Sequence, residues 1–398
     1  MRVLIVTKIF PNAVEPLSAP FNRQQFAALA KHCDVEVLAT IPWFPGAGLL
    51  GRRSSAGALA AVPTVEEIAG LHVRHPRTLF VPRMAHSTWG PLYAASLARL
   101  VPRYRGKIDV VLGSWAYPDG FAAVLFAQAL GVPAVVKLHG SDINNVAEMP
   151  GPRRMLQWAL PRAARIVAVS RALADKVTEL GVAPARIALV SNGVDSERFA
   201  PRDRSDRQSA RQILGLPADA RLALYVGNLK PAKGVLDLVA AAPAVLDASP
   251  HNYLALVGGG ESANAIAEAA NALGPERASR IVRLGPLPAD QVASWMAACN
   301  ILVLPSWNEG TPNVVLEALA SGRRVVACEV GGVPDLLTDA ELGVMVPPRQ
   351  PAQLSAALIH ELTVDYDPLA VAAKGARGGW AASAEALFNV LVDAVGTT

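Results

Sequence analysis

The chain has 398 residues, which is too long for one ordinary hydrophobic core and favours two domains of about 150–200 residues each. Hydrophobic residues make up 52% of the sequence and charged residues 18%, a balance that indicates a globular protein with large buried sheets. No apolar run reaches the ~20 residues that cross a bilayer, and the opening MRVLIVTKIFPN lacks a signal-peptide cleavage site. Cys33, Cys299 and Cys328 have neither metal-ligand nor disulfide spacing, so we expect a cytoplasmic protein.

The net charge of +4 is unevenly distributed. Residues 1–200 contain 22 Lys and Arg against 13 Asp and Glu, whereas the remainder contains 15 against 20. This excess predicts an anionic partner for the first half, such as a lipid surface or an acidic acceptor, although ordinary surface charge explains the counts equally well. The apolar residues of segment 43–50 beside Arg52 and Arg53 could face an acceptor or the inner side of a cell membrane, but we favour a surface loop.

The first elements along the chain predict a parallel sheet. Strands are expected over 3–7 and 35–40, with a helix over 21–31 between them, which is a βαβ unit. The first loop carries no G-x-G-x-x-G, so the nicotinamide dinucleotide fingerprint is absent. Segment 41–70 is predicted to be loop, and the alternation then resumes with a strand over 71–75, a helix over 92–101, a strand over 110–113 and a helix over 121–130.

His139 follows the next predicted strand, at 133–138. A lone histidine is more often structural than catalytic. Ligands bind at the carboxyl ends of parallel strands, however, and the following Gly140, Ser141 and Asp142 favour a functional role. Asp142 could act only to orient the turn or the histidine.

A second βαβ run predicts a second doubly wound domain. A strand over 165–170 and a helix over 171–180 precede the turn SNGVD at 191–195. The charged segment 200–220 is predicted to connect the domains, because a new strand begins at 222–226.

Two glycine-containing loops of the second half are candidate ligand sites, the first of them for a phosphate. GNLKPAKG at 227–234 brings Lys230 and Lys233 next to a strand end, although the P-loop spacing is not met. GGGE at 258–261 would allow a ligand to approach the backbone at Gly259 closely, though a tight turn explains it nearly as well.

The stretch from Ile301 to Leu337 contains two carboxylates in the pattern strand, loop, helix. Thr311 is predicted as the N-cap and Pro312 as the first helical residue, which places Glu309 just before the helix at the carboxyl end of a strand. Glu317 lies eight residues later, on the helix. The alternative is that Glu309 is a capping residue and Glu317 a solvated helix charge.

The ordered set of these motifs resembles the retaining glycosyltransferases of family 4. EGTPNVVLEALASG with GGVPDLL after it resembles the E-x7-E signature of that family, and HGSDIN, SNGVD, GNLKPAKG and GGGE follow its order and spacing. The resemblance covers essentially the whole chain. It implies the α/β GT-B fold, with two Rossmann-like, doubly wound domains facing across a cleft and a C-terminal helix that returns to the first domain. We expect residues 1–200 with about 376–398 on the acceptor side and residues 201–375 on the donor side.

The resemblance also implies a reaction and roles for residues. A sugar would pass from a nucleotide diphosphate donor to an acceptor with retention, with no cofactor or metal, and the residues do not distinguish UDP from GDP. Glu317 would bind the ribose, Glu309 and His139 would act at the donor sugar, and Lys233 would neutralise the diphosphate. Further donor contacts are expected at Gly259 and at the backbone of Gly310, Thr311, Asn313 and Val314. Tyr117, Asp119 and Asp142 are expected on the acceptor side.

Two positions depart from the family pattern. Many relatives have arginine where this chain has Asn228, and asparagine cannot supply a bidentate charge. Lys230 is close enough in sequence to substitute for it. Pro312 lacks a backbone N–H that another residue could offer the sugar.

For retention without an obvious nucleophile we prefer front-face displacement, with a covalent adduct on Glu309 as the alternative. The acceptor is expected to be a glycan, a lipid-linked molecule or a small molecule, and no nucleic acid partner is expected. Two other functions stay open, a nucleotide-sugar epimerase of the same architecture and a catalytically silent sugar-nucleotide-binding protein. The presence of both glutamates, Lys233 and His139 argues against the silent protein.

Overall fold

A computed structural model describes residues 1–51, 54–81 and 86–396. The chain divides into two compact units, Met1–Gly193 with Trp380–Thr398, and Val194–Gly379. The first boundary therefore lies between 193 and 194 instead of 200 and 201, and the last segment begins at 380 instead of 376. No helix among the described residues is long and apolar enough to cross a membrane.

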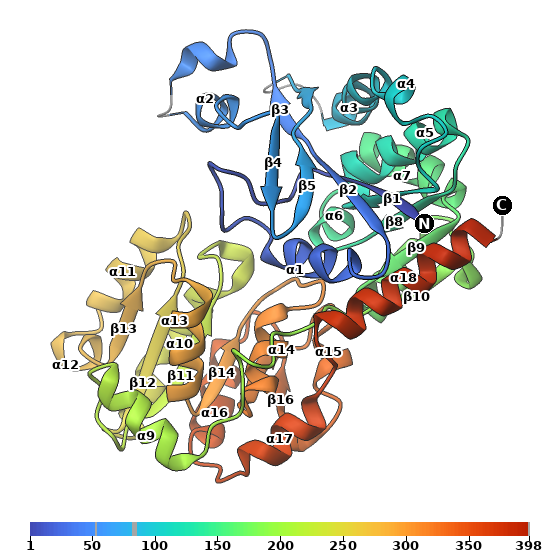
Figure 1. The fold of residues 1–398 in the computed structure, drawn as a ribbon. Helices are drawn as coiled ribbons and strands as arrows, with labels where there is room; N and C mark the ends of the chain where they lie inside the picture. The colour runs from blue at the N-terminus through green and yellow to red at the C-terminus, as the bar shows by residue number, and fades with distance from the viewer. Residues whose placement is uncertain (52–53, 82–85, 397–398) are drawn as a thin grey trace. The chain divides into compact units, whose positions relative to one another are not determined.

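The first unit has a twisted sheet covered by helices on both faces (Figure 1). Among the described residues this sheet has eight strands in the order β10-β9-β8-β7-β1-β2-β5-β4, and all neighbouring pairs are parallel except β4 with β5. The short strands β3 and β6 pair separately. The strands are β1 (Arg2–Thr7), β2 (Asp34–Ala39), β3 (Ile41–Trp43), β4 (Val65–Ile68), β5 (Leu71–Arg74), β6 (Arg77–Leu79), β7 (Val110–Ser114), β8 (Ala134–Lys137), β9 (Arg165–Ala168) and β10 (Ile187–Leu189). The helices are α1 (Pro20–Leu29), α2 (Ser55–Ala60), α3 (Trp89–Ala98), α4 (Val101–Tyr104), α5 (Phe121–Leu130), α6 (Ser141–Asn144), α7 (Pro150–Ala159), α8 (Arg171–Glu179) and α18 (Trp380–Gly396).

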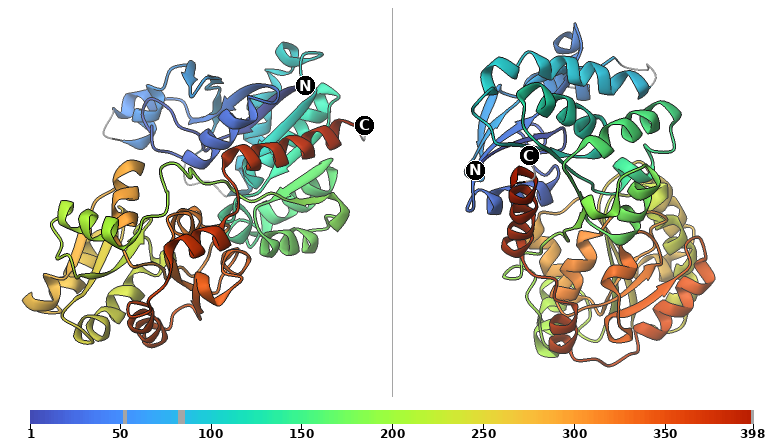
Figure 2. Two further views of the ribbon diagram at one scale, coloured as in Figure 1. Left: turned by 60° about the horizontal axis from the view of Figure 1, so that its bottom comes forward. Right: turned by 90° about the vertical axis from the view of Figure 1, so that its right-hand side faces the viewer.

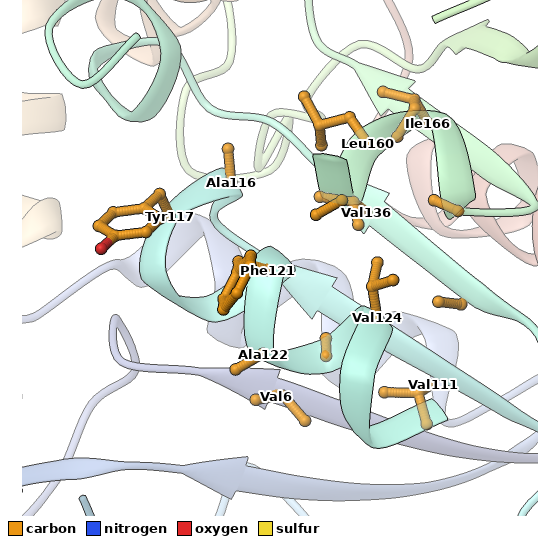
Figure 3. Packing of buried hydrophobic residues seen from close by; sticks show 14 of the residues in the cluster. Val6, Val111, Ala116, Tyr117, Phe121, Ala122, Val124, Val136, Leu160 and Ile166 are labelled. Carbon is orange, nitrogen blue, oxygen red and sulfur yellow. The ribbon is translucent and has the colours of Figure 1, made fainter. Parts of the chain in front are cut away.

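Each face of this sheet has its own apolar core, because buried parallel strands present hydrophobic side chains on both sides. On one face Phe26 and Leu29 of α1 pack with Leu387 and Leu391 of α18. The last helix, drawn in red, thus belongs to the unit in which the chain begins (Figures 1 and 2). On the other face the strands meet α5, as Figure 3 shows for the residues Val6, Val111, Val136, Phe121, Ala122 and Val124.

Segment 41–70 is more structured than predicted. It contains β3, α2 and β4 and a short 3-10 helix at Ala47–Leu50. Strand β4 (Val65–Ile68) pairs antiparallel with β5 across a two-residue turn. The prediction missed this hairpin. Leu49 is 92% exposed, and Leu50 and Trp43 are also exposed, whereas Arg52 and Arg53 of the candidate membrane-facing stretch lie outside the described residues.

The second unit repeats the architecture with a fully parallel sheet. Among the described residues its six strands follow the order β13-β12-β11-β14-β15-β16. They are β11 (Arg221–Val226), β12 (Asn252–Val257), β13 (Ile281–Leu284), β14 (Ile301–Leu304), β15 (Arg324–Cys328) and β16 (Gly343–Val346). The helices are α9 (Arg204–Ile213), α10 (Val235–Asp247), α11 (Ala263–Asn271), α12 (Pro275–Ala278), α13 (Ala289–Ala298), α14 (Asn313–Ala320), α15 (Val333–Leu336), α16 (Pro351–Glu361) and α17 (Pro368–Gly375).

Two separate cores again cover the two faces of the sheet. One contains α13, α14 and α17, and the other contains α10, α11 and α16. The predicted connection at 200–220 contains a helix of the second unit, α9 (Arg204–Ile213), which Asp203 caps by accepting a hydrogen bond from the backbone N–H of Asp206 at 2.8 Å. The prediction of two doubly wound Rossmann-like domains is confirmed.

Both sheets have the strand order in which the winding reverses beside the first strand, between β1 and β7 and between β11 and β14. Loops that follow such strands diverge and leave a crevice at the carboxyl edge, where open α/β sheets bind ligands.

Candidate active site

His139 lies at the carboxyl edge of the first sheet, just beyond β8, and its ring is held on several sides. The Ser114 hydroxyl at the end of β7 lies 2.9 Å from Nε2 of His139. The rings of Phe21 and Trp115 lie 5.1 and 5.8 Å from the imidazole, between centroids. Strand β8 ends at Lys137, so the predicted position of His139 just after a strand end is confirmed.

Ser114 connects His139 to the segment before α1. Its hydroxyl also lies 3.3 Å from the Asn22 side-chain oxygen, and the Asn22 amide donates to the carbonyl of Ile9 at 2.9 Å. Burial, with the charge of Lys137, lowers the pKa of His139 well below its usual value, so the ring is neutral at physiological pH.

Asp142 holds the turn that carries His139. Its buried carboxylate accepts hydrogen bonds from the backbone N–H groups of His139, Gly140 and Ala116 at distances from 2.7 to 3.2 Å. Ala116 belongs to the loop after β7, so Asp142 also joins two neighbouring loops of this edge. The structure favours the orienting role over contact with an acceptor.

Tyr117 and Asp119 are likewise placed inside the unit. The Tyr117 ring is 2% exposed and packs near Phe121 in the core (Figure 3), while its hydroxyl donates to the carbonyl of His86 at 2.6 Å. Asp119 is fully buried, accepts hydrogen bonds from the backbone N–H of Lys8 and the Tyr93 hydroxyl, and has its pKa raised to about 7 by burial. The expectation that these two side chains contact an acceptor is corrected, because both are used to shape loops.

Lys137 is a charged residue of this unit that sequence reasoning missed. It is fully buried on β8, and burial lowers its pKa to about 7. Its amine donates to the Gln25 side chain of α1, and Gln25 donates onward to Ser383 of α18 at 2.8 Å. A lysine within the apolar run PAVVKL was the available signal.

The second unit brings Lys233 and Glu309 together from positions 76 residues apart. Lys233 closes the short 3-10 helix after β11, and Glu309 lies in the loop after β14. Nζ of Lys233 donates a hydrogen bond to Oε1 of Glu309 at 2.7 Å, and the Glu309 side chain is only 9% exposed. Charge-assisted hydrogen bonds of this kind orient both side chains, so the phosphate-side and sugar-side candidates share one site.

A glycine permits the backbone contact beside Glu309. Gly331 has a φ of +55°, and a Cβ there would lie 2.0 Å from the Glu309 carbonyl oxygen. The next residue, Gly332, donates its N–H to the carbonyl of Gly310 at 2.7 Å. The turn after β15 therefore supports the backbone of the Glu309 loop directly.

Glu317 lies on α14, eight residues after Glu309 in the sequence, and is half-buried. Burial raises its pKa to about 8, although the nearby Arg198 opposes that shift. Arg198 is itself fixed by Asp195 at 2.7 Å and Asp290 at 2.6 Å. The alternative of a solvated helix charge is wrong.

The remaining donor-side candidates line the same edge of the second sheet. Helix α14 begins at Asn313 with Pro312 as the N-cap, one residue later than predicted. Gly310 is buried, Thr311, Asn313 and Val314 are half-buried, and Asn228 and Lys230 are exposed. The carbonyl of Gly259 accepts a hydrogen bond from the Leu229 N–H at 2.9 Å, which joins the GGGE turn to the GNLKPAKG loop.

Comparison with known proteins gives the family of the chain. Residues 27–198 match the model described as Glycosyltransferase Family 4, and residues 220–363 match the one described as Glycosyl transferases group 1. The D-inositol 3-phosphate glycosyltransferase of Streptomyces bingchenggensis is 31% identical over 86% of this chain and 80% of its own length. The putative teichuronic acid biosynthesis glycosyltransferase TuaC of Bacillus subtilis is 27% identical over 90% and 88%.

Solved structures share the fold at lower identity. Anabaena HepE in complex with UDP superposes with a TM-score of 0.71 and 18% identity over 98% of this chain and 100% of that one. Sucrose-phosphate synthase from Thermosynechococcus elongatus gives a TM-score of 0.72 with 19% identity over 100% and 97%. With two doubly wound units and relatives of this kind, the chain belongs to glycosyltransferase family 4 and is a glycosyltransferase of the GT-B fold.

Proposed function

We propose that this glycosyltransferase moves a sugar from a nucleotide diphosphate sugar to a glycan, lipid-linked or small-molecule acceptor, with retention and without a metal or cofactor. The observation that carries the proposal is the ion pair of Lys233 and Glu309 at the strand ends of the second unit. A donor joins a diphosphate to a sugar, so its site requires a cation and a sugar-binding carboxylate a short distance apart. HepE, which shares the fold, binds UDP in its crystal structure, and this supports a nucleotide donor here.

In the proposed reaction Lys233, Glu317 and Glu309 each contact a different part of the donor. The bond from the sugar C1 to the diphosphate oxygen breaks, and Lys233 stabilises the charge that develops on the leaving group. Glu317, beside Arg198, binds the ribose. Glu309 contacts the sugar, whose oxocarbenium-like character a carboxylate stabilises.

Retention follows if the acceptor attacks the face that the diphosphate leaves. The acceptor oxygen forms the new bond to C1, and its proton passes to the leaving phosphate oxygen, so no enzyme nucleophile is needed. In this proposal His139 acts at the donor sugar as a neutral imidazole, because burial lowers its pKa. We also propose that the protein contacts an anionic membrane surface peripherally, because residues 1–200 carry an excess of positive charge.

A thermal-shift screen against UDP, GDP and their sugars identifies the donor without knowledge of the acceptor. With the donor known, we expect Glu309→Gln and His139→Ala to lower donor hydrolysis or transfer about 100-fold or more. Glu276→Gln, at a glutamate whose side chain is 92% exposed, is the matched control and should keep the activity. Turnover like the wild type in either site variant removes that residue from the mechanism.

A further inference from the structure

Trp307 connects the two loops that carry Lys233 and Glu309. It stands in the loop after β14, two residues before Glu309. Its backbone N–H donates to the carbonyl of Ala232 at 2.9 Å, and its indole N–H donates to Oδ2 of Asp237 at 2.7 Å. Ala232 directly precedes Lys233, and Asp237 lies in the first turn of α10, which follows Lys233. Both N–H groups of Trp307 thus bind the segment that carries the lysine.

The surroundings of Trp307 fix it in this arrangement. The guanidinium of Arg349 lies 4.4 Å from the centroid of the indole ring, within the range of a cation–π contact. Arg349 has a φ of +60°, a left-handed conformation that is uncommon outside glycine. The two loops also touch at their backbones, since a Cβ at Gly234 would lie 1.9 Å from the carbonyl oxygen of Pro305.

We infer that Trp307 is a positioning residue that sets the distance between Lys233 and Glu309 by holding their loops in register through Ala232 and Asp237. The side chains of Lys233 and Glu309 meet over 2.7 Å at the ends of two flexible stems. An indole held by a hydrogen bond and by the Arg349 guanidinium over its ring is rigid by comparison. A displacement of about 1 Å at a reacting group can cost about 100-fold in rate. Trp307 therefore acts through its neighbours, and no contact of its own with substrate is required.

The first test reads the ion pair without any ligand. Acetic anhydride labels amines, and an ammonium held by a carboxylate is a poor nucleophile. In Trp307→Phe, which keeps a ring and loses the N–H donor, we expect labelling of Lys233 to rise several-fold by peptide mass spectrometry. Labelling of the exposed Lys230 should stay constant and serves as the internal reference. Trp380→Phe, the same change in the other unit, should alter neither lysine. Unchanged labelling of Lys233 in Trp307→Phe overturns the inference.

The second test uses binding and rests on the proposed function. With UDP or GDP, whichever the wild type binds, Trp307→Phe should raise the dissociation constant about 5- to 10-fold, and Asp237→Ala should match it. If both act through one hydrogen bond and one lysine, the double variant Trp307→Phe/Asp237→Ala should equal the singles. Adding Trp307→Phe to Lys233→Ala should then cost less than about 2-fold. If the fold-changes in the dissociation constant of the single variants multiply in the double variants, the inference is overturned. Absence of nucleotide binding in the wild type overturns the proposed function instead and leaves the labelling test to decide on Trp307.

Discussion

Glu309 and Glu317 are similar acids in very different surroundings. Both carboxylates are shielded from water, but Glu309 meets the amine of Lys233 at 2.7 Å, whereas the Arg198 guanidinium near Glu317 is shared with Asp195 and Asp290. Desolvation therefore dominates at Glu317, and the folded protein holds a proton there more tightly than the unfolded chain does.

This difference predicts how stability varies with pH. The pKa of Glu317 is about 8 in the folded state, against 4.5 for an unperturbed glutamate. A raised carboxyl pKa contributes stability that is fully present below the unfolded value and is lost as pH rises towards about 8. Denaturant unfolding at pH 5, 6.5 and 8 should show a larger loss in the wild type than in Glu317→Gln. Parallel profiles for the two proteins would contradict the assignment.

Sequence could locate residues at strand ends better than it could pair them. His139, Lys233 and Glu309 were predicted correctly at carboxyl ends, because the βαβ pattern alone fixes which end of a strand meets the ligand edge. The pairing of Lys233 with Glu309 depends on which strands become neighbours. Trp307 and Lys137 were missed for the same reason, since their partners lie 70 and 112 residues away in sequence.

At the scale of elements, turns decide where the loops of the site lie. The turn after β15 presses against the Glu309 loop at Gly331, and no helix or strand pattern signals that contact. The same limit applied to segment 41–70, where short elements separated by turns were taken for loop. Helix α5 and the buried strands were predicted well, because their apolar residues form patterns that are visible without tertiary contacts.

Alanine at Gly331 should affect activity as well as stability. The left-handed backbone alone costs roughly 1–2 kcal/mol for a residue with a Cβ, and here the added atom also meets the Glu309 carbonyl. Gly131, the C-cap of α5, has a φ of +73° and a ψ of +33°, and an added Cβ there meets nothing within 4 Å, so Gly131→Ala is a control for the left-handed backbone alone. Because of the added contact, Gly331→Ala should lose more stability than Gly131→Ala in denaturant unfolding, and only Gly331→Ala should lose about 10-fold or more in kcat. Equal activity in the two variants would argue against support of Glu309 by this turn.

At the scale of the whole molecule, the chain leaves the first unit at Gly193 and returns to it at Trp380. Helix α18 covers one face of the first sheet with Leu387 and Leu391, and Ser383 joins it to Gln25 of α1. The first unit is therefore complete only after the second has been synthesised.

Two neighbouring positions on α18 test this dependence. Leu391 is fully buried and Val392 is 46% exposed. Leu391→Ala should destabilise the first unit by about 2–5 kcal/mol, whereas Val392→Ala should stay within about 0.5 kcal/mol. Hydrogen exchange of peptides from α1 should become faster in Leu391→Ala only, because α1 packs beside α18. Equal exchange in both variants would mean that α18 contributes little to that core.

The two junctions between the units lie side by side, since Val194 and Gly379 form a parallel β-bridge. A segment whose ends meet can be removed and replaced without stretching the host chain. Residues 194–379 thus have the connectivity of an exchangeable cassette, and the matching unit of a relative can be spliced in at these two points. If this unit binds the donor, as proposed, donor preference should move with it in such chimeras.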